Sequence, residues 1–149
     1  MRVLVLACFL LCNIVSWRYS ASSSMLPSKM MAAVVSGPAP EGDFSKISIV
    51  SDHEVPTLEV GEVLIKVNYS SVNPVDWKII EPDFEDINPL KFPHVLGFDA
   101  SGTVVKCSAC KRLKVGDPVW ADLGKLWPLR GGELGAYAQY AVADGNFFL

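Results

Sequence analysis

The side chains best placed to do chemistry in this chain are an amide, an ammonium and two carboxylates: Asn73, Lys78, Asp76 and Asp99. The amide can both donate and accept hydrogen bonds, and the ammonium can pair with a phosphate or polarise a carbonyl. The simpler alternative is that Asn73 caps a short helix and that Lys78 is a solvated surface lysine. The two carboxylates also invite interpretation as an acid–base pair.

A strand-rich chain must position these side chains. Residues 62–69 alternate with the two-residue period of a strand, which predicts that Val63 and Tyr69 share one face. Gly102 lies within another predicted strand, where a missing side chain indicates a close backbone approach. Pro74 fits the first turn of a short helix. The expected strands are 31–35, 46–50, 62–69, 100–105, 118–120 and 136–143, the expected helix is 74–80, and loops cover 81–93 and 124–135.

The composition is that of one globular domain. The chain has 149 residues, of which 50% are hydrophobic and 19% are charged, and its formal net charge is −3. These values suit a packed core and argue against disorder. Because no lysine- or arginine-rich block is present, nucleic acid and anionic membrane surfaces are not expected as partners.

The N-terminus has the three-part pattern of a secretory signal peptide. A short positive end is followed by residues 3–15, which are almost wholly apolar, and then by small and polar residues up to 24. The apolar run is too short to cross a bilayer of roughly 30 Å as a helix. Residues 1–24 are therefore expected to be a signal or targeting peptide; the alternatives are a buried N-terminal strand or an uncleaved anchor.

The sequence leaves two destinations open. Residues 20–29 are rich in serine and free of acids, as transit segments tend to be, which favours entry into the secretory pathway and onward transport to a plastid. If translation instead starts at Met25, Met30 or Met31, the protein is expected in the cytoplasm. The predicted boundaries are a linker over 25–30 and a folded domain over 31–149.

The cysteines do not predict a zinc site. Cys8 and Cys12 lie in the leader, so the folded domain keeps only the pair Cys107 and Cys110, and the two histidines are distant in sequence. A structural zinc site needs four ligands, so a single pair is two short. We interpret the pair as free thiols on a hairpin turn, with a disulfide as the second alternative and metal binding as the third. An oxidising compartment would favour the disulfide.

Three segments, taken in order, resemble a known family. They are Val72-Asn73-Pro74-Val75-Asp76-Trp77-Lys78, residues 93–105 around Gly97-Phe98-Asp99, and Lys114-Val115-Gly116-Asp117-Pro118-Val119-Trp120. Their order and spacing resemble the N-terminal GroES-like catalytic domain of the medium-chain dehydrogenase/reductase superfamily, in its zinc-free quinone oxidoreductase and alkenal/enone reductase branch. The resemblance covers residues 31–149. It implies a mainly β fold, a GroES-like distorted β-barrel with one or two short helices.

The resemblance also argues against a catalytic zinc. Zinc-dependent relatives carry a cysteine ligand at the position of Asn73, and a histidine followed by a glutamate at the positions of Phe98 and Asp99. A neutral amide and an apolar ring remove two of the ligands that zinc requires. We therefore expect no zinc.

The activity that the resemblance implies is NADPH-dependent reduction of a quinone or an α,β-unsaturated carbonyl. Hydride addition builds negative charge on the carbonyl oxygen, which hydrogen-bond donors or a cation would stabilise. By resemblance, Asn73 and Lys78 contact the cofactor, and Lys78 is the candidate catalytic residue. The implied substrate cleft contains Asn73, Asp76, Trp77, Phe98 and Asp99, with the two carboxylates acting as local hydrogen-bonding groups that hold the cleft loops.

A nucleotide-binding half is not expected in this chain. No Gly-x-Gly-x-x-Gly follows a strand and opens a helix, and Gly131-Gly132-Glu133-Leu134-Gly135 precedes a strand instead. The resemblance therefore implies that the Rossmann domain is absent, that the chain is a fragment whose catalysis needs further sequence, and that a partner chain could cover an exposed apolar edge. The alternatives are a stand-alone, non-catalytic GroES-like module that binds a ligand or partner, and an inert fragment.

Overall fold

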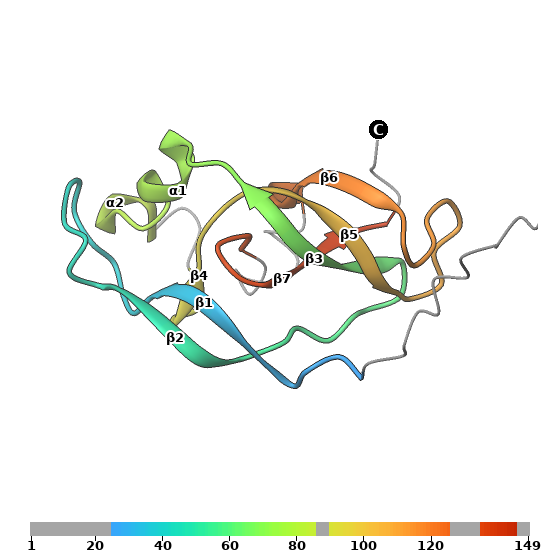
Figure 1. Cartoon of the computed structure of the whole chain (residues 1–149). Helices are drawn as coiled ribbons and strands as arrows, with labels where there is room; N and C mark the ends of the chain where they lie inside the picture. Colours follow the sequence, from blue (N-terminus) through green and yellow to red (C-terminus); the bar gives the residue numbers. More distant parts are fainter. Residues whose placement is uncertain (1–24, 86–89, 126–134, 146–149) are drawn as a thin grey trace, which may run out of the picture.

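The computed structural model describes residues 25–85, 90–125 and 135–145 (Figure 1). The predicted leader over 1–24 and most of the predicted loop over 124–135 lie outside these ranges. The elements are β1 (Lys29–Val35), β2 (Ile47–Glu54), β3 (Glu62–Ser70), α1 (Pro74–Lys78), α2 (Pro82–Glu85), β4 (His94–Val95), β5 (Asp99–Cys107), β6 (Pro118–Asp122), the 3-10 helix η1 (Leu123–Lys125) and β7 (Tyr140–Asp144).

The described strands form two antiparallel sheets. One has the order β2-β1-β4 and the other the order β6-β5-β3-β7. A single bridge between Ala32 and Ala138 connects β1 to the segment that leads into β7. The predicted mainly β class is confirmed, but within the described residues the strands form two sheets and no closed barrel.

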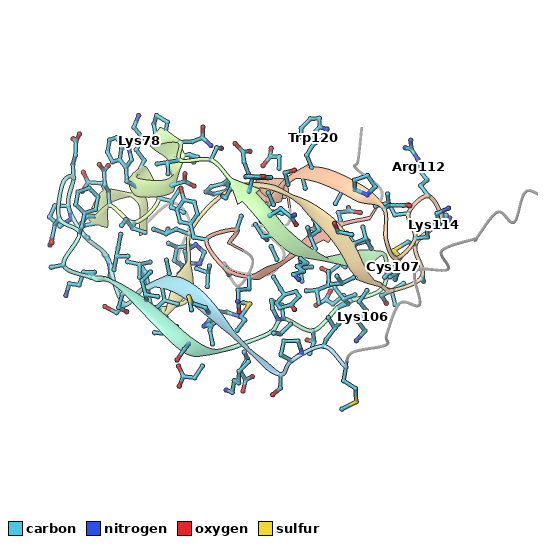
Figure 2. The ribbon with its side chains drawn as sticks, in the orientation of Figure 1. Lys78, Lys106, Cys107, Arg112, Lys114 and Trp120 are labelled. Atoms are coloured by element: carbon cyan, nitrogen blue, oxygen red, sulfur yellow. A yellow bond between two sulfur atoms is a disulfide. The ribbon has the colours of Figure 1, made fainter. Side chains whose placement is uncertain are left out.

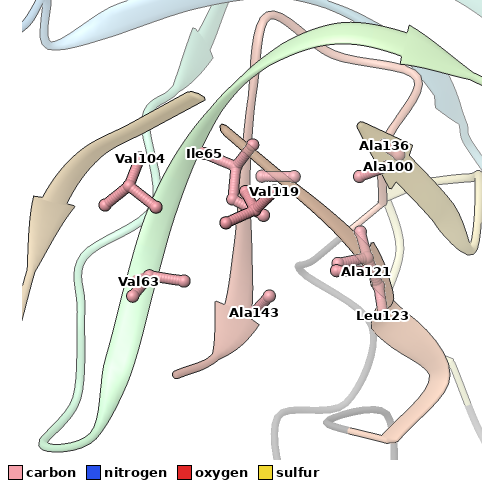
Figure 3. Close-up of a cluster of buried hydrophobic side chains, with 10 residues drawn as sticks. Val63, Ile65, Ala100, Val104, Val119, Ala121, Leu123, Ala136 and Ala143 are labelled. Carbon is pink, nitrogen blue, oxygen red and sulfur yellow. The ribbon is translucent and has the colours of Figure 1, made fainter. Parts of the chain in front are cut away.

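The main core lies on one face of the four-stranded sheet (Figure 3). Val63 and Ile65 on β3 and Val104 on β5 are fully buried. Each such side chain contributes roughly 1.5–3 kcal/mol when it is removed from water. The cluster also contains Ala100, Val119, Ala121, Leu123, Ala136, Ala141 and Ala143.

Several element boundaries differ from the predicted ones. α1 ends at Lys78, and Pro82 begins α2 within the predicted loop. The two-residue strand β4 was not predicted, because so short a segment has no readable period. β7 begins only at Tyr140, since the preceding residues pair elsewhere: Tyr137 donates its N–H to Leu96 and accepts from Ala33.

The face of β3 changes near its end. The register against β5 shifts between Val67 and Tyr69, which is the mark of a β-bulge. Tyr69 is consequently 76% exposed while Val63 is buried. The prediction that the two residues share one face was wrong, because alternation cannot reveal a bulge. Within the described residues, no helix is long and apolar enough to cross a membrane.

The close approach predicted at Gly102 is confirmed. A Cβ atom at this position would collide with the backbone carbonyl oxygen of Lys66 and would lie 2.8 Å from Cγ2 of Ile65. We expect Gly102→Ala to lower the free energy of unfolding by about 1–3 kcal/mol, because β3 and β5 would have to separate locally.

Urea denaturation measures this loss, with Gly37→Ala as the matched control. No atom lies within 4 Å of a Cβ at Gly37, so its stability should change by less than about 0.5 kcal/mol. Equal effects of the two substitutions would contradict the assigned β3–β5 contact.

Candidate functional site

The candidate site begins where β3 leads into α1. Asn73 is the N-cap residue of α1 with an extended backbone (φ −125°, ψ 156°), and Pro74 starts the helix. Proline is tolerated there because the first N–H groups of a helix have no partner within it. The Asp76 side chain reaches back and accepts the Asn73 backbone N–H at 2.7 Å. The sequence Asn-Pro-Val-Asp thus fixes the start of the helix with Asn73 at the N-cap position, and the hydrogen bond that closes the cap is accepted by the Asp76 side chain.

Asp76 joins three segments of the chain. Its Oδ2 accepts the Asn73 N–H and lies 2.8 Å from the Tyr137 hydroxyl, and its Oδ1 accepts the Phe98 N–H at 3.2 Å. The residue is only 3% exposed. Because an unpaired buried carboxylate would be costly, these donors make its burial possible. Asp76 therefore holds the start of α1, the start of β5 and the segment before β7 together.

A second carboxylate organises the edge of this network. Asp99 Oδ2 accepts hydrogen bonds from the Asn73 Nδ2 at 2.7 Å and from the Ser71 hydroxyl at 2.6 Å. The Asn73 Nδ2 also lies 3.0 Å from the Ser71 oxygen. Asp76 and Asp99 thus act as hydrogen-bond acceptors that hold loops, as the family resemblance implied.

An open hollow lies beside Asp99. It has a volume of about 360 Å³, and Ser71, Asp99, Tyr69 and Trp120 line it. Trp120, on β6, is 58% exposed and projects from the ribbon in Figure 2. The β-bulge described above leaves Tyr69 at the wall of the same hollow. A volume in this range with aromatic walls and a few polar groups is typical of small-molecule sites.

The other predicted site residues are placed differently. The Lys78 ammonium is exposed and lies 5.5 Å from the centre of the Trp77 ring, within cation–π range. The side chain of Phe98 packs against the buried cluster that contains Ile79 and Ile80. The structure therefore brings Asn73, Asp76 and Asp99 together directly. Phe98 joins them through its backbone, and Trp77 and Lys78 lie on the adjoining helix.

Other hollows are less suited to the same role. A larger one, of about 610 Å³, lies between the end of β2 and Lys91 and contains no member of the network. Another of about 320 Å³ lies between β1 and β3 and is lined by Tyr69 and Tyr137. The hollow beside Asp99 is distinguished by the Asp99 carboxylate and the Ser71 hydroxyl that donates to it.

Sequence reasoning missed Tyr137, whose hydroxyl also lies 3.2 Å from the Ser71 carbonyl oxygen. Alternation over the predicted strand 136–143 predicts that one of Tyr137 and Tyr140 is core and the other exposed, but both are half-buried. The sequence feature that belongs to this contact is Gly97, because a Cβ atom there would lie 2.7 Å from the Tyr137 ring. Burial, and next the hydrogen bond to Asp76, raise the pKa of Tyr137 above its usual value. The phenol therefore stays protonated and can act as a donor.

Cys107 and Cys110 form a disulfide with their Cα atoms 5.9 Å apart, so the preferred free-thiol interpretation was wrong. Ala109, at φ 56°, turns the chain so that the two residues meet. In the described part of the chain, no group of three or more His, Cys, Asp or Glu residues could hold a metal ion.

The bond between Tyr137 and Asp76 predicts a pH-dependent contribution to stability. Tyr137→Phe should lower the free energy of unfolding by about 1–2 kcal/mol near neutral pH, because Asp76 loses a buried donor. Tyr69→Phe is the matched control, since Tyr69 is largely exposed.

The raised pKa fixes the sign of this dependence. The folded protein holds the Tyr137 proton more tightly than the unfolded chain, so the contribution is complete below pH about 10 and is lost at higher pH. Urea denaturation at several pH values should therefore show the difference between wild type and Tyr137→Phe shrinking above pH about 10. A difference that grows there would contradict the assignment.

Comparisons with known proteins agree with this architecture. Residues 59–149, more than half of the chain, match the alcohol dehydrogenase GroES-like domain. The chloroplastic quinone-oxidoreductase homolog of Spinacia oleracea is 40% identical over 93 residues, which cover 62% of this chain and 26% of that protein. The chloroplastic NADPH-dependent alkenal/one oxidoreductase of Arabidopsis thaliana is 34% identical over 125 residues, which cover 83% of this chain and 31% of that protein.

A solved structure shows the same fold. The quinone oxidoreductase from Coxiella burnetii superimposes with a TM-score of 0.61 at 25% identity, over 81% of this chain and 36% of that one. This chain thus spans between about a quarter and a third of the length of the two plant relatives. The predicted resemblance is confirmed: the chain belongs to the alcohol dehydrogenase GroES-like domain family of the medium-chain dehydrogenase/reductase superfamily.

Proposed function

We propose that this domain forms the substrate-side wall of a zinc-independent, NADPH-dependent oxidoreductase that reduces quinones or α,β-unsaturated carbonyls. The observation that carries the proposal is the hollow with a polar edge of Ser71 and Asp99 and aromatic walls of Tyr69 and Trp120. The relatives named as quinone and alkenal/one oxidoreductases support it.

The described residues suit a flat, electron-poor acceptor. Aromatic side chains such as Tyr69 and Trp120 can stack on a planar ring, and the polar edge can orient its oxygens. Lys78 provides an exposed ammonium on the adjoining helix, and a cation stabilises the negative charge that develops on a carbonyl oxygen during reduction. In this scheme Asp76 and Tyr137 are positioning residues, since they hold Asn73 and the start of β5 in place.

The fit to NADPH is confined to one end of the cofactor. NADPH supplies a hydride when it is bound, and Asn73 and Lys78 are the polar groups that this domain would offer to its nicotinamide end. The strand pairs among the described residues are antiparallel, whereas a glycine-rich pyrophosphate cradle requires a βαβ unit. We therefore assign no residue of the described ranges to the phosphates.

We further propose that the protein acts in a plastid. Both plant relatives reported above are named as chloroplastic proteins. The serine-rich segment over 20–29, largely outside the described residues, is compatible with this route.

Fluorescence titration tests acceptor binding. A fully substituted quinone, which cannot add to thiols, should quench the tryptophan fluorescence of the full chain. Trp120→Phe should remove most of the quenching, because this ring lines the hollow, whereas Trp77→Phe should retain it. Absence of quenching would contradict the proposed site.

Activity is measured as NADPH oxidation with the same quinone and with a 2-alkenal, in a protein that joins this domain to a nucleotide-binding domain, because the described residues offer no cradle for the phosphates. Lys78→Gln should lower kcat/KM at least about tenfold by removing the cation. Lys46→Gln, at an exposed lysine between β1 and β2, should leave it unchanged. Acceptor binding without any turnover would overturn the enzymatic proposal and favour a non-catalytic ligand-binding module.

A further inference from the structure

The turn that follows β5 carries the disulfide at one end of the four-stranded sheet. Cys107 is the last residue of β5, and Cys110 lies three residues further on. Backbone hydrogen bonds hold the turn against the start of β3: Gly61 donates to the Ser108 carbonyl at 2.6 Å and Ser108 donates to the Glu62 carbonyl at 2.9 Å. These bonds do not involve the sulfur atoms, so they can hold the turn whether or not the sulfurs are joined.

Both sulfurs lie at the rim of the core and remain half-buried. The Cys107 Sγ is 3.7 Å from the Leu113 carbonyl oxygen, and the Cys110 Sγ is 3.6 Å from the Glu62 carbonyl oxygen. A reduced thiol behaves as a small apolar group and a weak donor, so the same two contacts suit the dithiol. A bridge that closes so short a loop also removes little entropy from the unfolded chain. Its reduction should leave the domain folded.

Positively charged residues flank the pair in the sequence. Lys106 immediately precedes Cys107, and Arg112 and Lys114 follow within the same turn; Figure 2 shows the three gathered at this end of the molecule. Lys111 adds a fourth positive charge next to Cys110. All four are exposed, and none forms an ion pair with a described carboxylate. Positive charge next to a cysteine favours its thiolate and so lowers the pKa of the sulfur as a leaving group.

We propose that Cys107 and Cys110 form a reversible thiol–disulfide exchange site whose substrate is an anionic thiol reductant. A thiolate of the reductant attacks one sulfur of the pair, forms a mixed disulfide and displaces the other as a thiolate, which takes up a proton. A second thiol of the reductant then releases the attacked sulfur, which is protonated in turn. Two electrons pass from the reductant, which becomes a disulfide, and the protein becomes a dithiol.

This site is separate from the proposed active site. Asp99 is the first residue of β5 and Cys107 the last of its nine residues, so the two lie roughly 26 Å apart along the strand. The exchange proposal therefore does not rest on the proposed reductase function. An experiment that contradicts one of the two proposals therefore does not contradict the other.

The first experiment measures reversibility in the full chain. The protein is equilibrated in buffers from fully oxidised to fully reduced glutathione, alkylated and digested with trypsin. Cleavage after Lys106 and Lys111 isolates a peptide that contains Cys107 and Cys110 and neither of the other cysteines. We expect complete conversion between disulfide and doubly alkylated dithiol, in both directions, with unchanged far-UV circular dichroism. The same form at both extremes, or unfolding on reduction, would overturn the proposal.

The second experiment tests the role of the cations. The variant Lys111→Gln/Arg112→Gln/Lys114→Gln should be reduced more slowly than wild type, because a protein thiol with a higher pKa is a poorer leaving group. The decrease in the reduction rate should be larger with glutathione, which is anionic, than with dithiothreitol, which is neutral. The reason is that the positive charges next to the cysteines also attract a negative reductant. Lys46→Gln, in the β1–β2 connection, is the matched control and should react at the wild-type rate. A rate unchanged by the triple substitution, or lowered equally for both reductants, would overturn the proposal.

Discussion

The structure around the candidate site depends on one buried carboxylate. Removing a carboxylate from water costs several kcal/mol unless donors compensate it, and Asp76 obtains its donors from Asn73, Phe98 and Tyr137. These residues belong to the start of α1, the start of β5 and the segment before β7, so satisfying a single side chain brings three distant parts of the chain together. The position of Asn73, and through it the contact with Asp99, follows from this constraint.

Much of the fold could be predicted because its signals are local. Alternation identified β3, Pro74 placed the start of α1, and Gly102 in a strand indicated the close approach of Lys66 that the structure contains. The failures arose where tertiary contacts override local pattern. The bulge before Tyr69 and the late start of β7 depend on partners in other strands, and neither the two-sheet arrangement nor the two-residue strand β4 has a periodic signature.

The candidate site could be predicted in part, and mainly from the family motif. The motif placed Asn73, Asp76, Trp77, Phe98 and Asp99 in one cleft, and the structure joins all of them except Trp77 by hydrogen bonds. The role of Tyr137 was not predicted, because this residue is 61 positions from Asp76 in the sequence. Its ring also packs on Gly97, a contact that only the folded chain reveals. The cysteine pair was misjudged for a similar reason. Spacing alone does not show that Ala109 adopts a left-handed conformation, which lets the two residues meet.

The central claim is that the Asp76-centred network positions an acceptor-binding hollow. The most direct measurement is an amide chemical-shift titration of the isotope-labelled chain with a fully substituted quinone. The account predicts saturable shifts concentrated at Tyr69, Ser71, Asp99 and Trp120, and their weakening in Asp76→Asn. Shifts concentrated at the larger hollow between β2 and Lys91, or no shifts at all, would contradict it.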